Sequence, residues 1–448
     1  MKPKLLLINP VNAARTGLTV NQSSRFPAIG LGIVAALTPP SWEVELADEN
    51  WVPFVYREAD LVGITAFTAS APRAYEIAQI YRERGTPVVM GGIHASMCPQ
   101  EALRYVDAVV QGEAEKVWTE VLADAEAGEL RRSYHGTDED LTAMRSPRRD
   151  LFHPGYLFAT VQTSRGCPMD CEFCSVTALN GRRYRRRPPE DVLDELETIA
   201  QELIFFVDDN IIGYGEKSRE QALALFKGMV DRGLRKRWLC QASLNFADDQ
   251  DLLRWAGRAG CQMVFLGLEA EDVDALLEVN KRLNLSRGVT SYEEAFRRIH
   301  RAGIAVLGAF IFGMDGDTPE KLRRRTRYMV RSGIDVMQAT YLTPLPGTRL
   351  FDRLHREQRL LRTDLPRDWS RYDMSEVVHQ PRGMSPAALA RAMAECNRRL
   401  YTRSVRVWKA VRTLWATRSP TAMMFAWQSN LNYRNVAFSR SAGDDCPR

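Results

Sequence analysis

Three cysteines stand close together in the middle of the chain. They are Cys167, Cys171 and Cys174, separated by steps of four and three residues. Soft thiolates bind the iron of iron–sulfur clusters, and a loop with this spacing can wrap around a single cubane. Three thiolates leave one iron of the cubane without a protein ligand. The spacing therefore predicts a cluster with an open iron that can bind a small molecule.

A structural zinc site is the alternative for clustered cysteines. Structural zinc requires four ligands, and no additional Cys or His lies beside this segment. The next candidates, His153 and Cys240, are distant in sequence. The pattern therefore favours an iron–sulfur cluster over zinc.

Together with Phe173, the cysteines form a Cys-x3-Cys-x-aromatic-Cys loop after an apolar run. In this loop the chain resembles the radical S-adenosylmethionine (SAM) superfamily, and the resemblance covers most of residues 155–350. It implies that SAM chelates the open iron of a [4Fe–4S] cluster through its amino and carboxylate groups. It also implies that one electron from the cluster cleaves SAM to a 5′-deoxyadenosyl radical. The cofactor would carry the difficult chemistry, while the protein positions it and excludes water.

The same resemblance implies which strand ends bind SAM. Acceptors for the SAM ammonium group are expected where the next strand ends in Asp-Asp-Asn. Gln241 and Ser243 at the next strand end would bond the ribose, and Glu269 at the one after it would bind either SAM or the substrate. The following strand, which contains glycine, would lie under the adenine. The SAM-binding residues implied in this way are Phe173, Asp208, Asp209, Asn210, Gln241, Ser243, Glu269, Phe310 and Phe312. For each of them, a helix cap or a buried hydrogen-bonding role is the alternative.

An arginine-rich run, Arg182–Arg187, follows the cysteine loop. An arginine at this place could clamp the SAM carboxylate or an anionic substrate. An exposed charged loop is the alternative interpretation.

A regular alternation of strands and helices must position these groups. In residues 1–125, continuous apolar runs such as Leu5–Ile8, Leu61–Thr65 and Val88–Met90 alternate with amphipathic stretches. Such runs are typical of a parallel sheet covered on both faces, so this part is expected to be a Rossmann-like, doubly wound α/β domain. Residues 126–155 are polar, contain Gly and Pro, and are expected to form a linker.

A second alternating series occupies residues 156–350 and predicts a partial barrel of the (β/α)6 type. Chemistry in such a barrel gathers at the C-terminal strand ends. The expected strands are Leu157–Thr163, Ile204–Val207, Trp238–Ala242, Met263–Gly267, Ala305–Ile311 and Val336–Tyr341. Residues 351–448 are expected to form a small C-terminal extension that is mainly helical.

A Rossmann-like domain placed before a radical SAM barrel resembles the cobalamin-binding class of this superfamily. Thr65-Ala-Phe67 stands where cobalamin domains carry a Ser-x-Leu element, and Gly91-Gly92 follows the next strand where they carry paired glycines. Glycines allow the backbone to approach a bulky nucleotide tail closely. The cobalamin contacts implied in this way are Asn50, Thr65, Phe67, Gly91, Gly92 and His94. His94 is expected as a turn residue or a phosphate-side contact rather than a cobalt ligand.

One loop departs from the methionine-synthase type of cobalamin domain, which ligates cobalt with His in Asp-x-His-x-x-Gly. This chain has Asp48-Glu-Asn50-Trp-Val-Pro53 at that place, without an imidazole. Any bound cobalamin is therefore expected to have no His ligand from this loop. A domain that has lost cobalamin would show the same sequence.

The composition and net charge of the chain indicate where in the cell the protein is found and which partners it binds. The chain has 448 residues, a net charge of +5 and eight cysteines, with no apolar run long enough to span a membrane. It is expected to be cytoplasmic, where thiols stay reduced. Nucleic acid is not expected as a partner, because no nucleic-acid-binding motif accompanies the arginines. Trp408, Trp415 and Trp427 in the basic C-terminal stretch could contact a membrane, but a helix packed on the barrel with its arginines in water is favoured.

The leading hypothesis is hydrogen abstraction from an unactivated carbon followed by cobalamin-dependent methylation. The architecture is similar to cobalamin-binding radical SAM proteins that act on hopanoid lipids, tetrapyrroles or natural products. The alternatives are radical cyclisation, rearrangement or carbon–carbon coupling, with or without cobalamin, and a non-catalytic iron–sulfur or B12 sensor. The expected partners are a small-molecule, lipid or peptide substrate and an electron donor such as flavodoxin or ferredoxin.

Overall fold

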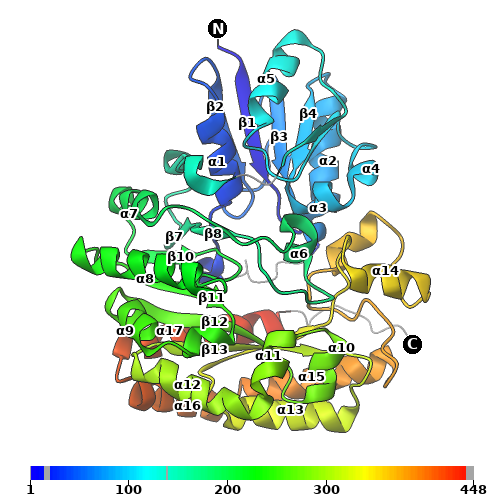
Figure 1. The fold of residues 1–448 in the computed structure, drawn as a ribbon. Helices are drawn as coiled ribbons and strands as arrows, with labels where there is room; N and C mark the ends of the chain where they lie inside the picture. Colours follow the sequence, from blue (N-terminus) through cyan, green and yellow to red (C-terminus); the bar gives the residue numbers. More distant parts are fainter. Residues whose placement is uncertain (1, 15–20, 138–139, 440–448) are drawn as a thin grey trace.

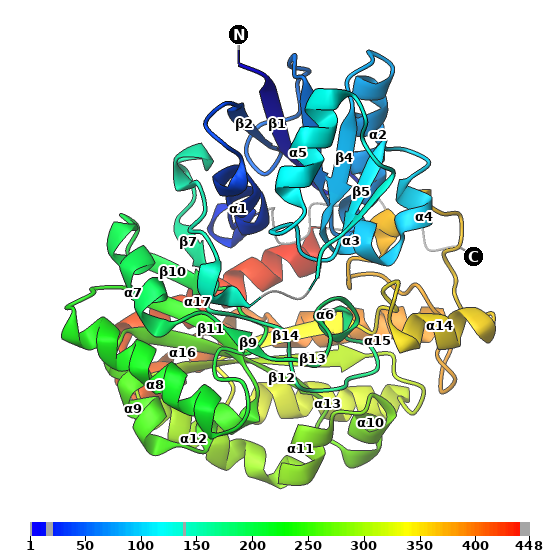
Figure 2. The ribbon, with the colours of Figure 1, turned by 45° about the horizontal axis from the view of Figure 1, so that its top comes forward.

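Two six-stranded parallel sheets form the framework of the computed structural model, which describes residues 2–14, 21–137 and 140–439 (Figure 1). The first sheet belongs to the N-terminal domain and the second to the partial barrel. C-terminal helices pack against the second sheet (Figure 2). This arrangement confirms the expected fold class, a doubly wound α/β domain followed by a partial barrel and a helical C-terminal part.

The N-terminal sheet has the strand order β2-β1-β3-β4-β5-β6. Its strands are β1 (Lys4–Asn9), β2 (Glu43–Asp48), β3 (Leu61–Thr65), β4 (Val88–Gly91), β5 (Ala108–Gln111) and β6 (Ser133–His135). Its helices are α1 (Ile29–Leu37), α2 (Ala71–Arg82), α3 (Gly92–Met97), α4 (Pro99–Ala102) and α5 (Trp118–Ala127). The chain leaves β1 toward β2 on one side and continues with β3 on the other, so the order reverses between β1 and β3.

Alternate residues of β1 pack into two different apolar clusters. Leu6 and Ile8 belong to the cluster that includes α2, whereas Leu5 and Leu7 belong to the one that includes α1 and α5. Successive side chains of a strand point to opposite faces, so the sheet is covered on both. This explains why its strands are continuous apolar runs rather than alternating ones.

The segment expected to be a linker, residues 126–155, contributes a strand to this sheet. Strand β6 pairs in parallel with β5, and Val110 faces Tyr134 in the register. Only Tyr134 of its three residues is buried. An edge strand this short, with one apolar residue, has no periodicity that distinguishes it from a polar loop.

The barrel sheet has the order β14-β13-β12-β11-β10-β7, with β7 and β14 at its two open edges. Its strands are β7 (Phe158–Val161), β10 (Leu203–Phe206), β11 (Arg237–Ala242), β12 (Cys261–Glu269), β13 (Ala305–Phe312) and β14 (Val336–Tyr341). All six lie within one or two residues of the expected ranges. In β13 every residue is buried, as a strand covered on both faces requires.

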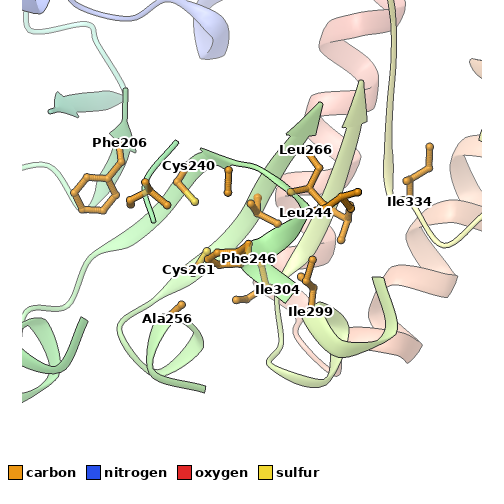
Figure 3. Close-up of a cluster of buried hydrophobic side chains, with 14 of the residues drawn as sticks. Phe206, Cys240, Leu244, Phe246, Ala256, Cys261, Leu266, Ile299, Ile304 and Ile334 are labelled. Carbon is orange, nitrogen blue, oxygen red and sulfur yellow. The ribbon is translucent and has the colours of Figure 1, made fainter. Parts of the chain in front are cut away.

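Helices cover the outer face of this sheet and form its main core. They are α7 (Pro189–Thr198), α8 (Glu216–Asp231), α9 (Gln250–Arg258), α12 (Tyr292–Arg301) and α13 (Pro319–Arg331), with the shorter α10 (Val273–Glu278), α11 (Arg282–Arg287) and α14 (Arg349–Arg356) near the strand ends. Figure 3 shows part of this core, where Cys240 and Leu266 from the sheet lie with Ile299 from α12. Cys240 and Cys261 are therefore core residues.

The C-terminal extension contains α15 (Pro386–Leu400), α16 (Arg403–Thr417) and α17 (Pro420–Phe438). Helix α17 covers the inner face of the barrel sheet, because its Ala422 and Ala426 share an apolar cluster with Leu307 and Val336. The Asn430 amide donates to the carbonyl oxygen of Asp335 over 2.9 Å. In Figure 2, α17 runs between the barrel sheet and the N-terminal domain.

Among the described residues, none of the helices combines the length and the apolar character that crossing a bilayer requires. This agrees with the sequence, which has no long apolar run.

A buried ion-pair cluster joins the segment between the domains to the barrel. Glu195 on α7 has a fully buried carboxylate and pairs with Arg187 over 2.6 Å and with Arg149. Arg149 also donates to the carbonyl oxygen of Thr160 in β7 over 2.8 Å. The carboxylate therefore compensates two cations that are largely removed from water.

We expect Glu195→Ala to lower the free energy of unfolding by about 3–5 kcal/mol, because it leaves Arg187 buried without a counter-charge. Urea denaturation followed by circular dichroism measures the loss. The control is Glu197→Ala on the same helix, whose carboxylate is 50% exposed and pairs with Arg232. The control should change stability by less than about 1 kcal/mol. Equal effects of the two substitutions would contradict the assignment.

Candidate active site at the cysteine loop

The cysteine loop lies at the C-terminal end of β7, the first barrel strand. It runs between β8 (Ser164–Arg165) and α6 (Ser175–Asn180), and β8 pairs with β9 (Arg185–Arg186) in a small antiparallel ribbon. Cys167, Cys171 and Cys174 are partly buried free thiols. In the described part of the chain, no three Cys, His, Asp or Glu side chains are arranged around a single metal ion.

Asp208 holds the start of this loop. Its Oδ1 accepts hydrogen bonds from the Thr163 amide (3.0 Å), the Thr163 hydroxyl (2.9 Å) and the Ser164 hydroxyl (2.5 Å). The residue is completely buried. One carboxylate oxygen is therefore turned toward the loop, whereas Oδ2 is buried without a hydrogen-bond partner among the described residues, and the expected contact of Asp208 with SAM stays a prediction.

Asp209 and Gly166 set the conformation just before Cys167. The Gly166 amide donates to the Asp209 carboxylate, whose pKa is raised to about 6 by burial and by the neighbouring Asp208. Gly166 has φ +86°, and a Cβ at this position would lie 2.2 Å from the carbonyl oxygen of Arg183. Only glycine fits both the backbone conformation and the close approach. Asp209 is only partly buried and remains a candidate for binding a ligand.

The other side of the loop is tied to later parts of the barrel. The Asn280 amide group donates to the carbonyl oxygen of Asp170 over 2.5 Å, and Arg349 on α14 donates to the same oxygen over 2.8 Å. The backbone amide of Glu172 donates to the carbonyl oxygen of Val279 over 3.2 Å. Contacts with the segment after α10 and with α14 therefore hold the loop against the barrel mouth.

Lys281 is a cation beside the cysteines that sequence reasoning missed. Its ammonium lies 2.6 Å from Glu269, and both side chains are largely buried. Burial raises the pKa of the Cys171 thiol to about 11, and the positive charge of Lys281 acts in the opposite direction. A buried cation favours the thiolate form that an iron–sulfur cluster requires. Lys281 follows a short helix in a mixed polar stretch, so no periodicity or motif marks it.

A small cavity of about 60 Å³ opens next to Cys171. Three cationic residues line the cavity, namely Arg182 from the arginine run, Lys281 and Arg282, and Ser243 from the end of β11 lies with them. Cations beside a prospective cluster ligand suit a ligand that carries a carboxylate, because charge-assisted hydrogen bonds to carboxylates are strong. The full lining is Pro168, Met169, Asp170, Cys171, Arg182, Ser243, Lys281, Arg282 and Leu283.

Asn210 and Gln241 link the adjacent strand ends. The Asn210 amide donates to the Ser243 hydroxyl over 3.2 Å, and Gln241 donates to the carbonyl oxygen of Asp208 over 3.4 Å. The Asn210 Oδ1 atom is buried and has no hydrogen-bond partner in the described residues. A buried acceptor without a partner is consistent with a ligand donor nearby.

The rings of Phe310 and Phe312 contact an outer helix, and their expected contact with SAM stays a prediction. Phe310 makes an edge contact with Tyr328 on α13 at 6.0 Å between ring centroids, and Phe312 lies under Arg325 of the same helix. Both rings therefore face the outer helix layer. Ile311, between them, shares an apolar cluster with Phe173 of the cysteine loop. In a strand that is buried on both faces, the pattern does not tell which alternate residues face the site.

The arginine run divides between two roles. Arg185 and Arg187 are buried in ion pairs with Glu113 and Glu195, which fixes the fold around the loop. Arg182 lines the small cavity, and Arg183 is exposed. Arg182 therefore lies where it could meet an anionic ligand in this cavity.

In the N-terminal domain, most of the expected cobalamin contacts lie at the C-terminal strand ends. Ligands of doubly wound sheets bind outside these ends, where the strand order reverses, here between β1 and β3. Gly92 has φ +88°, and a Cβ there would lie 2.6 Å from the Thr65 hydroxyl, so Gly91 and Gly92 stand beside the end of β3. Phe67 follows β3 and is 77% exposed. An exposed aromatic ring at this edge fits a large ligand that covers it.

His94 is placed differently. It is completely buried, and its Nε2 lies 3.0 Å from the Tyr75 hydroxyl and 3.2 Å from Glu101. Trp369, from the segment after α14, donates to Glu101 over 2.9 Å. This network joins the N-terminal domain to the C-terminal part through Nε2, and the expected contact of His94 with cobalamin stays a prediction. A lone His beside two glycines looks the same in sequence whether it faces a ligand or the core.

The loop after β2 is engaged by the segment that precedes the barrel. Asp48 accepts hydrogen bonds from Asn9 (2.8 Å) and from Tyr156, and Asn50 donates to the Tyr156 hydroxyl over 3.0 Å. The His153 ring stacks on Trp51 with ring centroids 4.4 Å apart. Its Nδ1 accepts a hydrogen bond from the Gly155 amide. One imidazole thus lies against this loop, but its Nδ1 is occupied.

Buried ion pairs hold the N-terminal domain against the cysteine loop. Glu113, directly after β5, lies 2.9 Å from Arg165 and also pairs with Arg185. Arg165 pairs with Glu115 as well over 2.5 Å. Arg165 and Arg185 belong to the ribbon that precedes and follows the cysteines. The C-terminal edge of the first sheet therefore meets the cysteine loop.

Comparison with known families and proteins agrees with this geometry. The radical SAM superfamily model matches residues 161–329, and the B12 binding domain model matches residues 16–122. The chain is 27% identical over 422 residues to bacteriochlorophyllide d C-12(1)-methyltransferase of Chlorobaculum tepidum, covering 89% of this chain and 88% of the relative. It is 30% identical over 355 residues to hopanoid C-2 methylase of Rhodopseudomonas palustris, covering 75% and 66%.

A solved structure shares the fold. The radical SAM methyltransferase TsrM from Kitasatospora setae, solved with cobalamin and a [4Fe–4S] cluster bound, has a TM-score of 0.63 and 19% sequence identity. The alignment covers 88% of this chain and 82% of that one.

The two neighbouring aspartates should respond differently to substitution. We expect Asp208→Ala to lower the free energy of unfolding by about 1–3 kcal/mol, because it leaves the Thr163 amide and two hydroxyls buried without an acceptor. Asp209→Ala is the matched control. We expect it to lower the free energy of unfolding less than Asp208→Ala does, and to weaken SAM binding more than Asp208→Ala does. Thermal unfolding and SAM titration calorimetry measure the two effects. Normal SAM affinity in a well-folded Asp209→Ala variant would assign that residue a structural role.

Proposed function

The chain belongs to the radical SAM superfamily and carries a B12-binding domain, and we propose that it is a cobalamin-dependent enzyme that methylates an unactivated carbon of a natural product or lipid. We assign cobalamin to residues 1–125 and the cluster with SAM to residues 156–350. The observation that carries the proposal is the meeting of the two domains at the cysteine loop, through the Glu113 ion pairs with Arg165 and Arg185. A methyl donor in the first domain then faces the place where SAM is cleaved.

We assign the cluster ligands to Cys167, Cys171 and Cys174. Their partial burial, the free state of the thiols and the adjacent Lys281 suit a cluster whose thiolates need stabilisation. When bound, the cluster supplies the electron that cleaves SAM, and cobalamin supplies the methyl group. The protein holds the loop through Asp208 and excludes water by burying its flanks.

Lys281 and Arg182 provide the positive charge beside Cys171 that a SAM carboxylate requires. Glu269 holds the Lys281 ammonium in place over 2.6 Å. Asp209 and the free acceptor of Asn210 are suitably placed acceptors for the SAM ammonium. This assignment keeps Asp209, Asn210, Ser243 and Glu269 from the expected set.

The substrate is proposed to be a small molecule or a lipid. Two relatives are named for methylation of a bacteriochlorophyllide and of hopanoids. The reductive step consumes one electron for each SAM cleaved, so we propose a flavodoxin or ferredoxin as donor. We also propose a cytoplasmic location, because a reducing compartment keeps the cluster thiols available.

Substitution of the cluster ligands tests the assignment. We expect Cys167→Ala, Cys171→Ala and Cys174→Ala each to abolish cluster absorption and SAM cleavage, because no spare thiol lies in the loop. Visible absorption of anaerobically reconstituted protein and 5′-deoxyadenosine formation measure the two effects. Cys98→Ala is the control, since Cys98 is a partly buried thiol of the N-terminal domain. Cys240, Cys261 and Cys396 are also expected to be dispensable for the cluster, and so is Cys446, which lies outside the described residues.

The products of the loaded wild-type enzyme separate the proposed function from its alternatives. Methylation consumes two SAM per turnover and yields S-adenosylhomocysteine together with 5′-deoxyadenosine. Deoxyadenosine without S-adenosylhomocysteine would favour cyclisation or rearrangement. A protein that binds the cluster but does not cleave SAM would be a sensor.

Bound cobalamin is expected to lack an imidazole ligand on cobalt. The loop after β2 carries Asn50 in place of His, His94 is buried in a network, and His153 is stacked on Trp51. Electron paramagnetic resonance of the cob(II)alamin state should therefore show no nitrogen splitting from an axial imidazole. The spectrum of His153→Ala should match the wild type, and a splitting that disappears in this variant would identify His153 as the ligand. Failure to bind cobalamin would leave the radical SAM assignment but remove methyl transfer.

A further inference from the structure

Helix α16 presents a large apolar face to solvent. Its side chains Val411 and Trp415 are 63% and 83% exposed, and they belong to a stripe along one side of the helix. We call this stripe the α16 face; it consists of Val407, Trp408, Val411, Leu414 and Trp415. The spacing of these residues places them on one side of the helix over about two and a half turns. Isolated apolar residues on a surface are ordinary, but a contiguous stripe with two tryptophans is not.

The buried side of the same helix is polar. The Lys409 ammonium donates to the carbonyl oxygens of Met329, Ser332 and Ile334 over 2.7–3.0 Å. The Thr413 hydroxyl donates to the buried carboxylate of Asp335 over 2.7 Å. Helices of globular domains normally bury their apolar side and expose their polar side. Since α16 does the opposite, packing among the described residues does not account for the α16 face.

The surroundings of the α16 face are basic. Residues 396–439 contain no Asp or Glu, whereas Arg403, Arg412 and Arg418 all lie on or next to α16. The Arg412 guanidinium lies 5.4 Å from the Trp408 ring centroid, and Arg406 lies 5.4 Å from that of Trp427 on α17. Guanidinium groups beside tryptophan rings match the boundary between phosphate headgroups and hydrocarbon, where both side chains are favoured.

We propose that the α16 face docks on a bilayer surface that contains anionic lipids, with the helix lying in the plane of the interface. The apolar stripe would enter the headgroup boundary, and the arginines would bind lipid phosphates. A second copy of this chain fits the face poorly, because a symmetric contact brings the same arginines together without any acidic residue of the segment to neutralise them. This inference concerns a surface distinct from the cysteine loop and goes beyond the proposed function.

The position of the α16 face leaves the proposed active site accessible. Helix α16 lies beside α12 at the base of the barrel, on the side away from the N-terminal domain (Figure 1). The cysteine loop and the loops of the first sheet lie toward that domain. A docked molecule would therefore hold the cysteine loop and the N-terminal domain away from the bilayer.

Co-sedimentation with vesicles tests the proposal on the full chain. The wild type should bind vesicles of phosphatidylglycerol and phosphatidylcholine, and should bind pure phosphatidylcholine vesicles much more weakly. Trp408→Ser with Trp415→Ser should weaken binding at least about tenfold, because it removes the two largest apolar side chains from the interface. Leu277→Ser is the control, since Leu277 is 59% exposed on α10, away from this helix. Circular dichroism verifies that both variants are folded.

A charge variant separates the two contributions. Arg403→Gln with Arg418→Gln should weaken binding to the anionic vesicles by about fivefold or more and reduce its dependence on salt. Unchanged binding of the tryptophan variant to anionic vesicles would overturn the proposal. So would a wild-type dimer, seen in size-exclusion chromatography with light scattering, that becomes monomeric in the tryptophan variant, because the face would then be a protein interface.

Discussion

The carboxylate of Glu113 compensates two arginines that flank the cysteine loop, and the relative placement of the two cofactor domains depends on it. Arg165 precedes the cysteines and Arg185 follows them, and both are buried where the first sheet meets the barrel. A buried guanidinium group is stable only when a carboxylate lies within hydrogen-bonding distance of it. A shift of the first sheet relative to the barrel would separate these charges, so the contact constrains how the two domains lie. The same contact holds the end of β5 at the mouth of the barrel. Chemistry that passes a group from one cofactor to another needs this kind of fixed approach.

Much of the architecture could be predicted because its signals are local. Apolar runs predict the six barrel strands, and the spacing of the three cysteines predicts the loop that would bind the cluster. The short edge strand β6 was missed because a single buried residue, Tyr134, carries its pairing. The rings of Phe310 and Phe312 face the outer helices, which the sequence does not reveal, because both faces of β13 are buried and the alternation that normally indicates orientation is lost.

The interaction partners of the charged residues could not be predicted from the sequence. Asp208 and Asp209 are neighbours in a strand-end motif, yet one carboxylate holds the loop backbone while the other keeps an accessible side. His94, expected as a turn residue or a phosphate-side contact, is buried beside Tyr75 and Glu101. Lys281, which no motif marks, lies beside Glu269 and the cysteines. Which partner a polar side chain meets is decided by contacts between distant segments, and these are absent from local patterns.

The inner face of the barrel sheet has a consequence for how the protein is made. Residues such as Leu307 and Val336 are covered by Ala422 and Ala426 of α17, which follows the last barrel strand only after a long intervening segment. During synthesis on the ribosome, the strands emerge well before the helix that shields them. We therefore expect the nascent barrel to expose apolar residues until α17 has been synthesised and has packed against the sheet. Such surfaces favour aggregation and are bound by chaperones. Overexpression that outruns this assistance should yield insoluble protein even when iron and sulfide are abundant.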